Sequence, residues 1–110
     1  MKKFLALYYA PAEAMKMMAN ATGERKKEGR KPWMQWMEKH GANIEDIGAP
    51  LMPALAITPK GKWSGSSRDV TGYSIVKAES AEAARKLFEG HPHLAWTAGC
   101  SIEFAELAAM

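Results

Sequence analysis

Residues 70–104 read VTGYSIVKAESAEAARKLFEGHPHLAWTAGCSIEF and decide the fold class of this chain. The opening of this stretch is rich in β-branched and aromatic side chains, which is typical of a strand. Ser80 can then cap a helix, because its side-chain oxygen can accept a free backbone N–H. Gly90 tolerates the positive φ at which helices often end, and Pro92 cannot continue the helix. The stretch therefore predicts a strand, a helix, a turn and a last strand at residues 100–104.

The N-terminal part of the chain predicts one strand followed by helical structure. Residues 3–10 read KFLALYYA, so apolar side chains alternate on both faces of the strand. Pro11 opens a first helical stretch, and over residues 31–40 tryptophan, methionine and histidine recur at i, i+3, i+4 and i+7. Pro32 fits the first turn of a new helix, and it also fits a kink in a helix already running from Glu24. The sequence leaves both alternatives open.

The middle of the chain predicts a second strand and a long connection. Residues 43–47 form the strand, which ends at the Gly-Ala-Pro of residues 48–50. The connection from there to Asp69 is rich in glycine and proline, as long functional loops often are. Within it, residues 55–57 and 62–63 could pair as a small hairpin across Thr-Pro-Lys-Gly.

The order of the main elements is strand, helix, strand, long connection, strand, helix, strand. With right-handed crossovers this order predicts a ferredoxin-like α+β sandwich, βαββαβ, in which four antiparallel strands carry both helical regions on one face. The other face would expose large apolar side chains of the first and third of these strands. We therefore expect a homodimer in which the two sheets pack against each other.

Length and composition predict one domain over residues 1–110. Hydrophobic residues make up 47% and charged residues 25% of the chain, which is ordinary for a globular protein. No apolar run approaches the roughly 18 residues of a membrane span, and the apolar segment after the N-terminal Met-Lys-Lys is too short for a signal peptide. We therefore expect a cytoplasmic protein without a membrane partner. Cys100 is the only cysteine, which excludes an intrachain disulfide and a cysteine-based metal cluster.

The net charge of +3 is concentrated in one place. Residues 23–31 hold five basic and two acidic residues, which accounts for the whole excess. Phosphate recognition normally needs a broader basic surface with interleaved aromatic side chains. We interpret the run as a solvated loop or helix face and expect no nucleic-acid partner. The three histidines have no carboxylate nearby that would complete a ligand set, so we also expect no metal and no cofactor.

Several segments together resemble the YCII-related family of the dimeric α/β-barrel superfamily. They are the opening KKFLALYYAP, the GAPL after the second predicted strand, VTGYSIV, the helix start AESAEAA, and the closing GHPHL and GCSIE. The resemblance covers nearly the whole chain. It implies a ferredoxin-like protomer whose sheet pairs with that of a second copy, with a pocket near the loops.

Some members of that family carry a histidine–aspartate dyad, with the histidine on the first long helix and the aspartate directly before a proline. In this chain His91 stands before Pro92, and no histidine lies near residues 30–33. The sequence therefore departs from the family pattern at both positions.

His91 and Asp69 are the candidate catalytic residues. His91 lies on a turn beyond a helix, where a rigid backbone could aim its imidazole at a pocket and where its pKa suits proton transfer. The alternative is a turn histidine that satisfies the last helix carbonyls. Asp69 is the nearest carboxylate candidate in the sequence, because it ends the long connection where the third main strand begins.

The candidate ligand-binding residues are Tyr8, Trp63, His93 and Trp96. Trp63 lies in the long connection and Trp96 in the turn after Pro92, so neither fits a core position easily. The tryptophans at helical spacing, Trp33 and Trp36, are interpreted as core or dimer packing. An apolar, aromatic cavity near His91 is the expected outcome.

Two functional hypotheses follow. The first is an enzyme that acts on a small apolar or aromatic metabolite, with His91 as general acid or base. The second is a non-catalytic homodimer that uses the same residues to bind a small ligand or a partner. A third hypothesis is haem degradation, which relatives in the same superfamily carry out. A haem titration without a Soret shift would exclude it.

Overall fold

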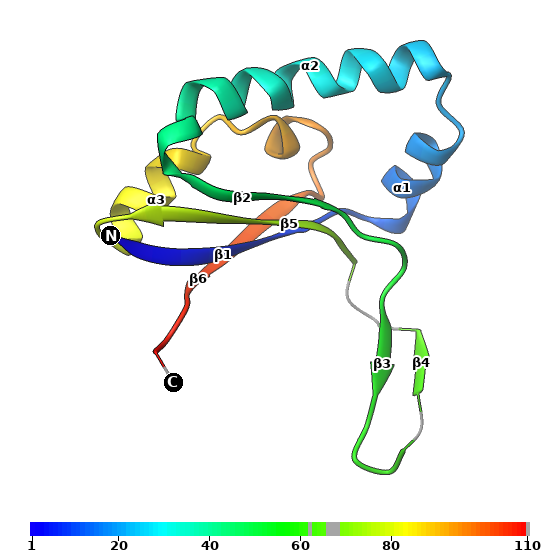
Figure 1. Ribbon diagram of the computed structural model, residues 1–110. Helices are drawn as coiled ribbons and strands as arrows, with labels where there is room; N and C mark the ends of the chain where they lie inside the picture. Colours follow the sequence, from blue (N-terminus) through cyan, green and yellow to red (C-terminus); the bar gives the residue numbers. More distant parts are fainter. Residues whose placement is uncertain (62, 66–68, 110) are drawn as a thin grey trace.

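The computed structural model contains a four-stranded antiparallel sheet with the helices on one face and a separate two-stranded hairpin (Figure 1). It describes residues 1–61, 63–65 and 69–109, and only the backbone of residues 63 and 64. The elements, with η for a short 3₁₀ helix, are β1 (Lys2–Tyr9), α1 (Ala12–Ala19), α2 (Gly23–His40), η1 (Gly41–Asn43), β2 (Ile44–Pro50), β3 (Leu55–Ile57), β4 (Trp63–Gly65), β5 (Val70–Ala78), α3 (Ala81–Phe88), η2 (Pro92–Ala95) and β6 (Ser101–Glu106).

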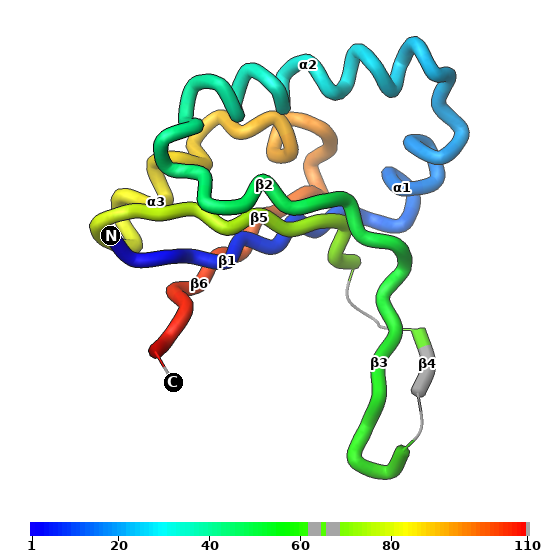
Figure 2. Tube along the Cα trace, viewed as in Figure 1, coloured from blue at the N-terminus to red at the C-terminus, as the bar shows by residue number. Residues whose placement is uncertain are grey.

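The strand order confirms the ferredoxin-like fold. The sheet runs β2-β5-β1-β6, so β1 and β5 lie in the centre and each pairs antiparallel with its neighbours. The Cα trace shows α1, α2 and α3 on the same side of this sheet (Figure 2). The predicted signals of the 70–104 stretch are also confirmed: Ser80 accepts a hydrogen bond from the backbone N–H of Ala83, and Gly90 has φ +70°.

The hydrophobic core lies between the sheet and the helices. Phe4 and Val76, opposite each other on the two central strands, are at most 1% exposed and belong to one core cluster with Trp36 of α2 and Phe88 of α3. The indole N–H of Trp36 donates to the carbonyl of Leu87 over 2.8 Å, so α2 and α3 are joined by a partly buried hydrogen bond as well as by ring stacking. The interpretation of Trp36 as a core residue is confirmed.

Helix α2 is one continuous helix from Gly23 to His40, with Pro32 in its interior. It begins where Thr22 accepts a hydrogen bond from the N–H of Arg25 at 3.1 Å, an N-cap that offsets part of the cost of an internal proline. Of the two alternatives for Pro32, a fresh start is therefore wrong. The basic run belongs to this helix and not to a loop.

Strand β2 extends beyond the predicted boundary at Ile47 and continues through Gly48 to Pro50. The prediction was wrong because Gly48 does not end the strand but forms a bulge, with φ +78° and a shift in the pairing with β5. The polar groups that the bulge removes from the ladder find other partners. The N–H of Gly48 donates to Oδ1 of Asp46 at 2.8 Å, and the carbonyl of Ile47 accepts from the Ser74 hydroxyl at 2.7 Å. A proline is tolerated here because β2 is an edge strand.

The predicted hairpin in the long connection exists as β3 paired with β4. Lys62, which we expected in it, lies outside the described residues. The hairpin projects from the sheet on the side away from the helices (Figure 1). Large side chains of β3 face solvent, since Leu55 and Ile57 are 66% and 77% exposed, and Met52, just before the hairpin, is 83% exposed.

The sheet face opposite the helices is covered by no element of the described chain (Figure 1). Leu5 and Leu7 of β1 pair with Ile75 and Tyr73 of β5, and all four side chains are half-buried on this face. The predicted alternation of side chains between the two faces of each strand is confirmed. Among the described residues, no helix is long and apolar enough to cross a membrane.

Candidate functional site

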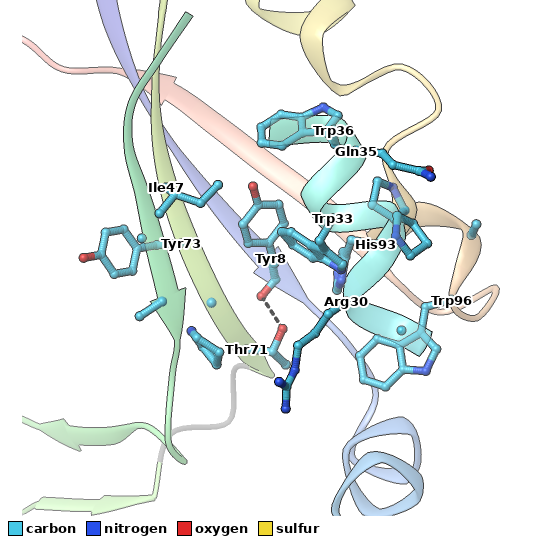
Figure 3. Close-up of a pocket in the computed structure, with 18 of the residues that line it drawn as sticks. Tyr8, Arg30, Trp33, Gln35, Trp36, Ile47, Thr71, Tyr73, His93 and Trp96 are labelled. Atoms are coloured by element: carbon cyan, nitrogen blue, oxygen red, sulfur yellow. Dashed lines mark hydrogen bonds between the residues drawn. The ribbon is translucent and has the colours of Figure 1, made fainter. Parts of the chain in front are cut away.

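A cavity of about 900 Å³ separates helix α2 from the bulged edge of the sheet. Its floor and walls come from β1, β2, α2 and the segment around η2, and several of its walls are aromatic. The side chains that line it include Tyr8, Trp33, Trp36, Ile47, His93 and Trp96. Figure 3 shows Tyr8, Trp33 and Ile47 together at this cavity, whereas Tyr73 turns away from it. The expected aromatic cavity is therefore present.

The tryptophans of α2 divide into a core residue and a wall residue. Trp36 is 6% exposed and belongs to the core, although one side of it lines the cavity. Trp33, one turn earlier, is half-buried, and its ring lies edge-on to that of Tyr8 with the centroids 5.1 Å apart. The i, i+3 spacing places both rings on the same helix face. Helix α2 thus presents an aromatic surface both to the core and to the cavity.

Tyr8 begins a buried chain of hydrogen bonds that anchors the β2 bulge. Its hydroxyl donates to Oγ of Ser74 at 2.8 Å, and Ser74 donates to the carbonyl of Ile47. Burial raises the pKa of Tyr8, although the hydrogen bond with Ser74 opposes that rise. Tyr8 is therefore a neutral phenol at physiological pH. It lines the cavity as predicted, but its proton is already engaged within the protein.

His91 is fully buried among aromatic rings and does not line the cavity. Its ring stacks on Tyr8 at a centroid distance of 5.3 Å and lies edge-on to Trp33 and Trp36, each at 4.5 Å. Nδ1 accepts a hydrogen bond from the backbone N–H of His93 at 3.0 Å, while Nε2 has no partner among the described residues. Burial, with a smaller contribution from the charges of neighbouring histidines, lowers the pKa of His91 to about 3. Its imidazole is therefore neutral at pH 7 and separated from the cavity by rings.

His93 lines the cavity, but one of its ring nitrogens is bound to the backbone. Nε2 lies 2.8 Å from the carbonyl oxygen of Tyr9, and because a carbonyl only accepts, Nε2 carries the proton. Burial lowers the pKa of His93, and the backbone carbonyl of Tyr9 opposes that effect. The residue ties η2 to the end of β1, which holds the loop wall of the cavity in place.

The structure does not bring the two candidate catalytic residues together. Asp69 is exposed, and its backbone carbonyl accepts a hydrogen bond from the N–H of Ala10. Neither ring nitrogen of His91 contacts the Asp69 carboxylate, since Nδ1 binds His93 and Nε2 has no partner within the described chain. The side chain of Trp63 lies outside the described residues. Trp96 lines the cavity beyond His93, as predicted.

Sequence reasoning missed the cationic part of the wall. Lys26, Arg30 and Lys39 line the cavity from α2, and Arg30 extends from the helix into it (Figure 3). The available signal was the spacing of Lys26, Arg30 and Trp33 at i, i+4 and i+7, which places them on one helix face. It was missed because the helix was expected to begin afresh or to kink at Pro32, which separates the basic run from the tryptophans.

The described side chains give little support to a metal or haem site. No group of three His, Cys, Asp or Glu residues in the described chain is arranged to hold a metal ion. A haem iron needs an axial ligand from the protein. On the cavity wall, His93 is bound to a backbone carbonyl, and His40 lies at the last residue of α2 against Trp36.

The backbone of this chain is similar to that of a solved enzyme at low sequence identity. No protein-family model matches the chain, and no curated protein matches it. The solved structure is that of 5-chloro-2-hydroxyhydroquinone dehydrochlorinase from Burkholderia phenoliruptrix AC1100 in complex with 2,5-dihydroxybenzoquinone. The match covers 92% of this chain and 90% of the enzyme's chain, with 18% sequence identity and a TM-score of 0.49. At these values the likeness says nothing about the site. The assignment of a ferredoxin-like fold rests on the strand order of the chain itself.

Proposed function

We propose that this protein binds a small, flat, apolar or aromatic molecule in the cavity between α2 and the sheet. The observation that carries the proposal is the combination of a volume of about 900 Å³ with aromatic walls from Tyr8, Trp33 and Trp96. Ligand cavities typically measure about 300 to 1,000 Å³ and combine apolar walls with a few polar groups. Aromatic walls favour flat ligands because rings stack or meet edge-to-face.

Binding without catalysis fits the geometry better than an enzyme does. General acid–base catalysis needs a titrating group with a pKa near the working pH and within hydrogen-bond reach of the substrate. His91 is shielded by Trp33 and Trp36, and its pKa of about 3 makes it a weak base. His93 and Tyr8 reach the cavity, but each is engaged in a hydrogen bond within the protein.

We also propose that the functional unit is a homodimer, in line with the resemblance to the YCII-related family. The accessible surface of the chain is 7994 Å², whereas a compact monomer of 12.1 kDa exposes about 6,000 Å². A stable interface removes about 800 Å² from each partner. The uncovered sheet face around Leu7 and Tyr73 and the exposed side chains of the β3–β4 hairpin lie on the same side of the molecule and are the surfaces that we propose for this interface (Figure 1).

A cavity-filling variant tests the binding proposal. Gly29 lies on the cavity wall, and a side chain built there meets nothing within 4 Å. We expect Gly29→Phe to fold normally and to abolish binding of small planar aromatic compounds, followed by NMR chemical-shift changes at the indole N–H groups of Trp33 and Trp96. Gly23→Phe is the matched control, because it adds the same bulk to α2 away from the cavity. Binding that survives Gly29→Phe and leaves both indoles unchanged would contradict the proposal.

The second candidate function is an enzyme in which His91 transfers a proton without help from Asp69, whose carboxylate does not contact the imidazole. One observation favours it: because Nδ1 of the neutral imidazole accepts a hydrogen bond, Nε2 of His91 carries the proton, and this buried donor has no partner among the described residues, which is a feature of functional sites. Access would require Trp33 to move. If a substrate is identified, His91→Ala should abolish turnover on this hypothesis, and unchanged turnover would eliminate it.

A further inference from the structure

We infer that the ligand of this cavity is an aromatic carboxylate, an anion as well as a flat ring. This inference rests on the proposed function and specifies its ligand class. The observation behind it is the charge of the wall: Lys26, Arg30 and Lys39 contribute three cations, while Glu89 is the only carboxylate that lines the cavity in the described chain. Glu89 is already bound to Arg85, with a separation of 2.8 Å.

The three cations are not neutralised from within the protein. In the part of the chain that the structure describes, none of them makes an ion pair or a side-chain hydrogen bond, whereas Lys3 and Lys77 share Glu45 on the edge of the sheet. A cation beside a low-polarity wall interacts more strongly with an incoming anion than one surrounded by water. The cavity wall therefore carries positive charge that a bound anion would neutralise.

Arg30 has the geometry to hold a carboxylate while the ring of the same ligand contacts tryptophan. It lies three residues before Trp33 on α2, so the guanidinium and the indole share one helix face. Figure 3 shows Arg30 extending into the space between the sheet and Trp96. A guanidinium can donate two parallel hydrogen bonds to one carboxylate, a planar arrangement that matches a benzoate or an arylacetate. With a neutral ligand, the guanidinium N–H groups of Arg30 would donate their hydrogen bonds to water instead.

Matched pairs of acids and amides test the inference. The probes are benzoate and benzamide, phenylacetate and phenylacetamide, and indole-3-acetate and indole-3-acetamide, measured by calorimetry and by NMR shifts of the indole N–H groups. Each pair keeps the ring and removes the charge. We expect the acids to bind at least about tenfold more tightly than their amides, because a hydrogen bond to a charged group is worth roughly that factor or more. The preference should shrink as salt is added.

Arg30→Gln should lower the affinity for the acids about 10-fold to 100-fold and leave the amides unchanged. Lys31→Gln is the matched control, because it removes the same charge from the next position of α2, which does not line the cavity. Circular dichroism would verify that both variants keep the fold.

The two proposals fail in different ways. If amides bind as tightly as acids and Arg30→Gln affects neither, the carboxylate inference is overturned and the aromatic cavity stands. If no probe binds and neither indole responds, the proposed function is overturned, and the carboxylate inference with it.

Discussion

At the scale of single residues, His91 shows how the tertiary structure changes the meaning of a sequence signal. A histidine on a turn before a proline is a candidate catalytic residue, because its ordinary pKa suits proton transfer. In the structure its ring is enclosed by Tyr8, Trp33 and Trp36, and its pKa falls to about 3. The environment makes it a neutral buried group whose Nδ1 caps η2.

This burial makes the stability of the protein depend on pH. The folded-state pKa of His91 lies below its ordinary value of 6.5, so the unfolded chain binds the additional proton. The contribution to the free energy of unfolding is complete above about pH 6.5 and is lost progressively as the pH falls toward 3. At pH 5 the loss from this residue is roughly 2 kcal/mol. Urea unfolding at pH 7.5 and pH 5 measures it.

Two variants separate His91 from the other titrating groups. His91→Asn keeps an acceptor for the N–H of His93 but does not titrate, so the loss of stability between pH 7.5 and pH 5 should become smaller by about 2 kcal/mol. His40→Asn at the half-exposed end of α2 should retain most of the loss. Equal pH dependence in the wild type and in His91→Asn would show that the imidazole is solvated in the folded state.

At the scale of elements, the bulge in β2 shapes the cavity. Without it, the strand would follow the regular pleat of β5. With it, Ile47 and Gly48 leave the ladder and their backbone groups bind Ser74 and Asp46 instead. The residues from Ile47 to Pro50 then line the cavity opposite α2. The buried Tyr8–Ser74 hydrogen bond connects this edge to the centre of the sheet.

The bulge depends on glycine at position 48. A Cβ there would overlap the backbone carbonyl of Tyr73, and the φ of +78° is unfavourable for other residues. We expect Gly48→Ala to lower the free energy of unfolding by at least about 2 kcal/mol. Gly61→Ala is the control, because Gly61 has φ +80° but open space around it, so it should cost only about 1 kcal/mol. Equal losses in the two variants, measured by urea unfolding, would show that β2 can move away from β5.

At the scale of the whole molecule, the uncovered sheet face and the projecting hairpin are the surfaces that the proposed dimer would cover (Figure 1). The radius of gyration of the protomer is 15.2 Å, whereas about 13 Å is typical of a compact chain of this length. The excess reflects a flat shape, with extents of 42 × 38 × 21 Å, from which the hairpin projects (Figure 1). A second copy that covers the sheet face would bury the half-exposed side chains of β1 and β5.

We expect the wild-type chain to sediment as a dimer and Leu7→Asp to sediment as a monomer. An aspartate at this position would place an unpaired carboxylate in the interface, which costs several kcal/mol. Met34→Asp on the outer side of α2 is the control and should remain dimeric, since Met34 is 58% exposed and does not line the cavity. A wild-type chain that remains monomeric at high concentration would overturn the dimer proposal. Before the comparison, Leu7→Asp should be tested for a native circular dichroism spectrum.

The sequence alone was sufficient for the type and order of the main elements, although not for the end of β2 or for the continuity of α2 at Pro32. Strand and helix signals between residues 70 and 104, the Ser80 cap and the Gly90 terminus depend on local conformational preferences, and all of them are confirmed. The expectation of an aromatic cavity also came from the sequence, since Trp96 has no simple place in the core. The strand, helix and cap signals could be predicted because each depends only on neighbours within a few residues.

The tertiary structure decided which side chains face the cavity. His91 and Asp69 were chosen by residue type, but burial and direction depend on elements far away in the sequence, and they place His91 behind Trp33 and leave Asp69 at the surface. Arg30 became part of the wall because α2 runs unbroken past Pro32 and passes over a bulged strand. Local sequence encodes conformation, whereas the polarity and solvation of a site arise only when distant segments meet.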